Sequence, residues 1–143
     1  TTRIITKLNN DYGLDLERLL AASHLSLFIR YDQLFLIPDR VLESFSTLPY
    51  EYIGMPVGQW EGERLEPLHD FISRFGSHFT RGRIQIPDEK VPQWISGRDI
   101  RYPQTDLTPQ GQYLLVTDQS DRNLGLGKLL PKRLRNMLPR GSR

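Results

Sequence analysis

The chain has 143 residues, a formal net charge of +2 and no cysteine, which suits one ordinary domain or two small ones. The lack of cysteine excludes disulfides, thiolate metal ligands and a cysteine nucleophile. No apolar run approaches the roughly 20 residues that span a bilayer, and no signal-peptide pattern opens the chain. We therefore expect a cytoplasmic protein without a membrane partner. Because the sequence begins at Thr1 rather than Met, we expect it to be part of a longer protein.

The remaining motifs of common catalytic centres are missing as well. His24, His69 and His78 show no i, i+4 spacing of the kind that binds a metal on a helix. The sequence contains no G-x-S-x-G turn and no glycine-rich phosphate loop. Residues 125–128 come nearest to such a loop but lack its length and its Ser or Thr after Lys128. We predict no catalytic residue and no metal site in this chain.

The first elements alternate between short helices and strands. Residues 1–10 suggest a short strand or a linker remnant. A helix is expected after Asp15, which is a suitable N-cap. Residues 25–37 have two apolar runs around a polar turn and predict a β-hairpin. A second short helix is expected to follow Pro38.

The next elements complete a mixed α+β unit. Residues 52–60 predict a strand that Gly and Pro interrupt, and therefore a bulge or a sheet edge. An amphipathic helix is expected over residues 66–75, with Gly76 as its C-cap. Residues 83–86 predict a short strand. Together these elements form a unit of roughly 75 residues, near the lower limit for independent stability.

The second half predicts a small mixed barrel. Residues 89–96 favour a short helix, and residues 102–111 form a connector rich in turn residues. Tyr113–Thr117 is an unbroken apolar run typical of a buried strand. Residues 124–130 are its expected hairpin partner, and residues 132–138 form a basic turn or strand.

The positive charge of the chain is concentrated at its end. The last 23 residues hold seven Lys or Arg and one acidic residue, a local formal charge of +6, and the other 120 residues carry −4. A disordered basic tail would rarely contain the six leucines that are interspersed here. Since Lys and Arg that neutralise phosphates also release counterions, the pattern indicates a folded surface for a polyanion.

Particular motifs give a family resemblance. WISGRDI (residues 94–100), YLLVTDQSDRNLGLGKLLPKRLRNMLPR (residues 113–140), YGLDL (residues 12–16) and LPYEYIG (residues 48–54) occur together. The set resembles the C-terminal region of RsmF-type bacterial enzymes, within the Nol-Nop-Sun group of RNA cytosine-5 methyltransferases. The most specific part is the LGLGK motif followed by R-x-R-N-x-x-P.

The resemblance implies an α+β fold with two small domains. Residues 1–10 would be a linker remnant, residues 11–88 a mixed α+β pre-PUA domain, and residues 89–143 a PUA-like RNA-binding domain, a small β-barrel with short helices. It also implies that S-adenosylmethionine and the cysteine nucleophile belong to a catalytic domain in cis, so this chain would be a targeting region without its own cofactor. RNA, and ribosomal RNA in particular, is the implied partner.

The residue pattern and the resemblance together give a set of candidate RNA-binding residues. Two glycines would let the RNA backbone approach, four cations would contact phosphates, an asparagine would bind a ribose 2′-OH or a base edge, and two residues after the short helix would lie on the rim. These residues are Gly125 and Gly127, Lys128, Lys132, Arg133 and Arg135, Asn136, and Gly97 and Arg98.

Other interpretations remain open. In the alternative interpretation, the two glycines relieve crowding inside the barrel and Asn136 is a structural cap. Trp60 and Trp94 lie in apolar segments and are expected in the core rather than as stacking platforms. As an alternative function, the chain would be a protein-docking module that contacts its own catalytic domain or a ribosomal protein. In that case an apolar surface would carry the binding.

Overall fold

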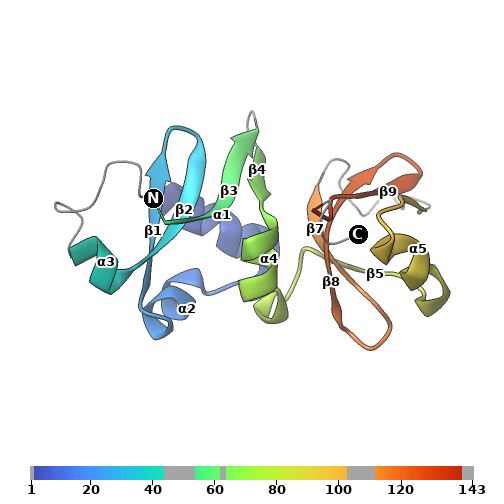
Figure 1. The fold of residues 1–143 in the computed structure, drawn as a ribbon, viewed down its shortest axis with the longest axis horizontal. Helices are drawn as coiled ribbons and strands as arrows, with labels where there is room; N and C mark the ends of the chain where they lie inside the picture. Colours follow the sequence, from blue (N-terminus) through green and yellow to red (C-terminus); the bar gives the residue numbers. More distant parts are fainter. Residues whose placement is uncertain (1, 44–53, 62–63, 103–111, 140–143) are drawn as a thin grey trace. The chain divides into compact units, whose positions relative to one another are not determined.

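The computed structural model describes residues 2–43, 54–61, 64–102 and 112–139. It divides into two compact units, Thr1–Phe71 and Ile72–Arg143 (Figure 1). Each unit combines short helices with its own β-sheet. The predicted α+β class is therefore confirmed.

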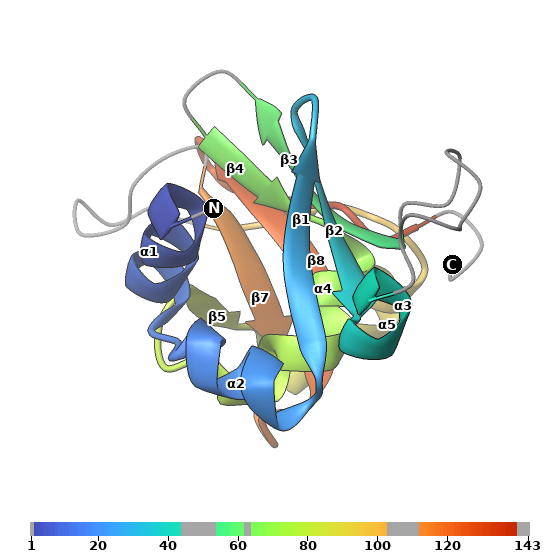
Figure 2. The same ribbon diagram turned by 90° about the vertical axis from the view of Figure 1, so that its left-hand side faces the viewer.

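The first unit contains an antiparallel four-stranded sheet with the order β1-β2-β3-β4, in which β1 and β2 form a long hairpin (Figure 2). The predicted hairpin, the helix after Asp15 and the start of a helix after Pro38 are confirmed. The Asp15 carboxylate accepts a bond from the Arg18 N–H and caps its helix. The elements are α1 (Thr2–Tyr12), α2 (Leu16–Ala22), β1 (Leu25–Arg30), β2 (Gln33–Pro38), α3 (Asp39–Glu43), β3 (Met55–Glu61) and β4 (Arg64–Pro67), and α4 (His69–Phe75) begins here.

The prediction of a strand or linker over residues 1–10 is wrong, because α1 occupies this segment. Ile4, Leu8 and Tyr12 recur every four residues and are all buried. The Asn9 side chain also accepts a bond from the Leu16 N–H, which fixes the start of α2. Burial of this apolar stripe outweighs the turn preference of the asparagines.

The helix predicted over residues 66–75 is shorter than expected. It begins at His69, since β4 takes up the preceding residues and pairs with β3. Pro67 suits this position because β4 is an edge strand of the sheet. The expected irregularity near β3 is present as a register shift between Leu34 and Phe35. Gly76 is not a left-handed C-cap, because the chain continues there into a 3₁₀ turn.

The second unit is built around a five-stranded mixed sheet with the order β5-β7-β8-β9-β6, which curls around one core. The predicted buried strand, its hairpin partner and the basic strand after it are confirmed, as is the short helix that carries Trp94. Part of the predicted connector, residues 103–111, lies outside the described residues. The elements are η2 (Gly76–His78), β5 (Arg83–Gln85), η3 (Asp88–Lys90), α5 (Val91–Ile95), β6 (Ile100–Arg101), β7 (Tyr113–Thr117), β8 (Asn123–Leu130) and β9 (Arg133–Asn136).

One face of this sheet encloses the core of the second unit. Trp94 is fully buried there, as predicted, and its indole N–H donates to the carbonyl oxygen of Leu124 at 2.8 Å. The core side chains come from strands at both ends of the sheet and from α5. They are Ile84, Ile86, Trp94, Ile100, Leu114, Val116, Leu129, Leu134 and Leu138.

The boundary between the units differs from the sequence-based division at residues 88 and 89. Strand β5 pairs in parallel with β7, with Ile84 opposite Val116, and so it is part of the second sheet. Gly76 also lies against Leu115 of β7. The chain therefore changes units inside α4, between Phe71 and Ile72. Among the described helices, none has the length and apolarity that a membrane crossing requires.

Candidate nucleic-acid interface

Four cationic residues lie on the outer face of three neighbouring strands in the second unit. On β9, Arg133 and Arg135 are exposed, whereas Leu134 between them is buried in the core. Arg101 of β6 lies opposite Arg133, and Lys128 of β8 lies opposite Arg135. Directly opposed residues of antiparallel strands share a face. These four residues, Arg101, Lys128, Arg133 and Arg135, are called the basic surface below.

The basic surface places like charges directly opposite each other twice. Such pairs destabilise a sheet, by up to about 1 kcal/mol each. Two weak contacts offset part of this cost. The Arg133 guanidinium lies 3.5 Å from the Asp99 carboxylate, and both side chains are partly exposed. The Lys128 ammonium lies 5.0 Å from the centre of the Tyr113 ring, which is within the range of a cation–π contact. The two pairs bring four positive charges together on one face of the sheet at a small cost in stability.

Two more of the predicted cations are exposed beside these strands. Lys132 lies in the turn between β8 and β9 with a φ of 64°, and its carbonyl oxygen accepts from the Tyr102 N–H. Arg98 follows α5, and its carbonyl oxygen is held by Asn136. Gly97, before it, has a φ of 96° and ends the helix.

The two predicted glycines do not form an open approach to the protein backbone. Gly125 and Gly127 are buried, and the positions of their missing Cβ atoms lie toward core side chains. A Cβ on Gly125 would lie only 2.3 Å from Leu138, and one on Gly127 would lie 2.9 Å from Val116. The Gly125 N–H is already bonded to the Asn123 side chain at 2.9 Å. The geometry favours the interpretation that these glycines relieve crowding.

Asn136 likewise has its polar atoms occupied within the protein. Its side chain is buried and donates to the carbonyl oxygens of Trp94, at 2.7 Å, and Arg98, at 3.2 Å. The amide oxygen accepts from the Leu138 N–H at 2.9 Å, and the Asn136 N–H donates to Asp99 at 2.8 Å. The contacts join β9 to the end of α5. This arrangement favours the structural cap over a contact with ribose or base.

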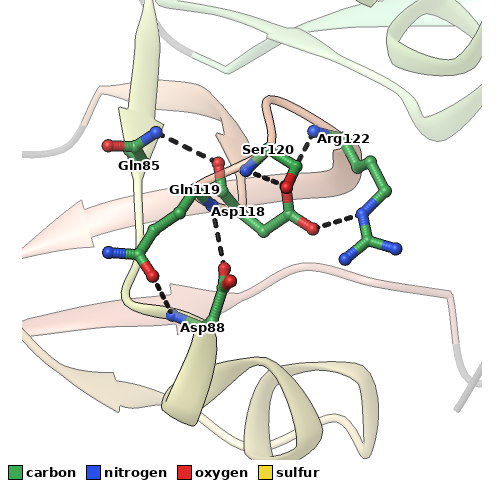
Figure 3. Close-up of polar contacts among 6 residues, drawn as sticks. All are labelled: Gln85, Asp88, Asp118, Gln119, Ser120 and Arg122. Atoms are coloured by element: carbon green, nitrogen blue, oxygen red, sulfur yellow. Dashed lines mark hydrogen bonds and ion pairs between the residues drawn. The ribbon is translucent and has the colours of Figure 1, made fainter.

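The turn between β7 and β8 fixes the hairpin that carries Lys128 (Figure 3). The buried Asp118 carboxylate accepts from the backbone N–H groups of Arg122 and Ser120, and from the Arg122 guanidinium at 2.6 Å. The backbone bond from Arg122 is the largest influence on the pKa of Asp118 and lowers it; burial opposes this, and the Arg122 side chain lowers it further. Gln119 and Asp88 exchange two bonds that join the turn to η3.

Sequence reasoning missed Arg101 as part of the basic surface, and it missed the contact of Lys128 with the Tyr113 ring. Arg101 precedes the turn-rich segment, and β6 has only two residues, too few to give a periodic pattern. The alternation of a polar Arg101 with an apolar Ile100, which is buried, was the sequence signal that could have placed Arg101 on the outer face. Tyr113 was assigned to a buried strand, and its position beside Lys128 depends on the pairing register, which sequence does not show.

A curled mixed sheet around one core, with a basic outer face, defines the second unit as a PUA-like barrel. In agreement, residues 81–143 match the family described as the PUA domain of the methyltransferase RsmF.

The similarity extends beyond this domain. The chain is 26% identical over 119 residues to the ribosomal RNA small subunit methyltransferase F of Psychromonas ingrahamii, covering 80% of this chain and 24% of the relative. It is 29% identical over 115 residues to the protein of the same name from Klebsiella pneumoniae, covering 80% and 23%. The sequence resemblance is thus confirmed, and the chain spans about a quarter of the length of these relatives. In the part of the chain that the structure covers, no cluster of His, Asp and Glu has the composition of a metal site.

Proposed function

We propose that the basic surface binds structured RNA through its phosphates, and that the chain is the RNA-binding region of an S-adenosylmethionine-dependent ribosomal RNA cytosine-5 methyltransferase. The observation that carries this proposal is the pair of like-charged cross-strand contacts, Arg101 with Arg133 and Lys128 with Arg135. Their cost to folding is offset when phosphates lie over them, because each neutralised phosphate releases counterions.

The proposed recognition depends on charge and shape. Arg133, Arg135 and Arg101 offer forked guanidinium donors suited to two phosphate oxygens at once, and Lys128 adds a point charge. Adjacent strands lie about 4.8 Å apart and alternate residues on one strand about 7 Å apart, so the four groups lie within one patch. Contacts of this kind position RNA without reading bases. Selection of the modified cytosine would then rest on the catalytic domain in cis and on the folded RNA.

The test is an RNA-binding titration at two or more salt concentrations. Wild-type chain, Arg133→Ala/Arg135→Ala and a control, Arg74→Ala/Lys90→Ala, are titrated against a labelled structured RNA. The control removes two exposed cations from α4 and η3 instead. We expect weaker binding only for the first variant, with a salt slope reduced by about 0.7 to 0.9 for each lost phosphate contact.

Equal affinity of the wild type and Arg133→Ala/Arg135→Ala, or a binding constant insensitive to salt, would refute the phosphate surface. In that event the protein-docking alternative predicts that charge changes have little effect and that apolar substitutions weaken binding to the partner.

A further inference from the structure

Tyr31, in the first unit, is the most exposed of the large hydrophobic side chains in the described residues. It lies at the tip of the β1–β2 hairpin, and 85% of its surface is accessible. Burying an aromatic ring is one of the larger favourable contributions to folding, and this ring makes no such contribution. The position of Tyr31 therefore needs a reason outside the core.

The backbone at Tyr31 is also unfavourable for a tyrosine. Tyr31 and Asp32 form a two-residue loop between the paired residues Arg30 and Gln33. Tyr31 has a φ of 55°, and Asp32 does not share the positive sign. Positive φ at the first of two loop residues is typical of type II′ turns, in which this position favours glycine. A side chain there costs on the order of 1 kcal/mol, so neither folding nor turn geometry accounts for the ring.

The neighbours of the ring orient it without covering it. The Arg30 guanidinium lies over the ring, 5.4 Å from its centre, within the range of a cation–π contact. Asp32 follows directly, its side chain is exposed, and its carbonyl oxygen accepts from the Trp60 N–H at 2.8 Å. The formal charges of Arg30 and Asp32 balance, so these two neighbours of the ring do not together favour an anionic ligand. A flat uncharged ligand suits it better.

We propose that Tyr31, oriented by Arg30, is a stacking platform for an unpaired nucleobase. The site is separate from the basic surface and has a different chemistry: it binds the face of a base, whereas the basic surface binds the backbone. Stacking of this kind tolerates any base, because every base has a π-face. The proposal rests on the proposed RNA-binding function and adds a preference for RNA that contains single-stranded residues.

The test compares two RNAs of equal phosphate number, a stem-loop with an unpaired loop and a fully paired duplex. The variant Tyr31→Gly removes the ring and gives the turn the residue that it favours, so it folds at least as stably as the wild type. We expect it to bind the stem-loop about 5- to 150-fold more weakly and the duplex as the wild type does. Tyr31→Trp retains a ring and should retain the preference for the stem-loop.

A 2-aminopurine placed in the loop reports stacking directly. Its fluorescence should be quenched on binding to the wild type and much less on binding to Tyr31→Gly. If Tyr31→Gly binds the stem-loop as the wild type does, while Arg133→Ala/Arg135→Ala weakens binding to both RNAs, the platform is refuted and the basic surface stands. If neither variant alters binding to either RNA, the proposed function itself fails.

Discussion

The side-chain amide of Asn136 donates a 2.7 Å hydrogen bond to the carbonyl oxygen of Trp94, joining the last described strand to the end of α5. The residue lies within the R-x-R-N-x-x-P motif that suggested an RNA contact, yet it is buried. The motif therefore combines two functions on one strand. Its alternate residues face outward as cations and inward as structural groups.

Asn136→Ala should destabilise the second unit by about 2 to 3 kcal/mol, because it removes the side-chain bonds to the Trp94 and Arg98 carbonyl oxygens and the bond from the Leu138 N–H. Asn136→Asp keeps the acceptor for the Leu138 N–H but loses both donated bonds, and should be no better. Urea denaturation in a Trp60→Phe background checks this, since Trp94 is then the single tryptophan and reports on the second unit. Unchanged denaturation midpoints would contradict the structural role.

Gly125→Ala should also act through stability rather than through RNA contact. Its φ of 92° disfavours a side chain, and the added Cβ would lie 2.3 Å from Leu138. We expect a loss of about 2 kcal/mol or more in the free energy of unfolding. The RNA affinity of the folded protein should stay the same when it is measured below the melting temperature of the variant. If the Gly125→Ala protein is folded but binds RNA more weakly, the result would contradict the structural role and indicate that Gly125 contacts RNA.

Asp118 should make the stability of the β7–β8 turn depend on pH. Its folded-state pKa is lowered from 3.8, so the ionised form stabilises the fold above this pH. The contribution is lost as the pH falls through the lowered folded-state pKa. Asp118→Asn should therefore be less stable than the wild type near neutral pH, and the difference should shrink in acid below about pH 3.8. Denaturation series across this range measure it, and a difference independent of pH would show that the charge is unimportant.

Arg101→Thr should separate stability from binding. The change removes one like-charged cross-strand contact with Arg133 and introduces a residue that favours strands. Stability should rise slightly or stay level, by a few tenths of a kcal/mol at most. RNA affinity should fall, and more strongly at low salt. The opposite result, a loss of stability with unchanged RNA affinity, would show that Arg101 stabilises the fold and does not bind RNA.

The local sequence predicted those elements whose apolar run, turn residues and cap residues all lie within one short segment. Tyr113–Thr117 is an apolar run bounded by polar turns, and its burial at all five positions follows directly. The hairpin at residues 25–37 and the helix after Asp15 contained their own turn and cap residues. In these places local preference and tertiary structure agree.

The missed features depend on contacts between distant residues. Helix α1 exists because Ile4, Leu8 and Tyr12 find a core, and Tyr12 packs 6.5 Å from Phe71, centre to centre. The role of Asn136 depends on carbonyl groups about 40 residues earlier in the chain. Sequence located the positive charge correctly, but the strand register decides which cations share a face.

The contacts of residues 72–79 with β7 and β8 have a practical consequence for the isolation of the second unit. The segment from Ile72 to Phe79 supplies the carbonyl oxygen that binds Asn123, and Gly76 packs on Leu115. A fragment that starts at residue 81, where the family match begins, lacks residues 72–79. The part of β7 and β8 that these residues contact would then be exposed to solvent, which favours self-association. A fragment that starts ahead of α4, at Leu68, retains the contacts of Ile72 with Asn123 and of Gly76 with Leu115.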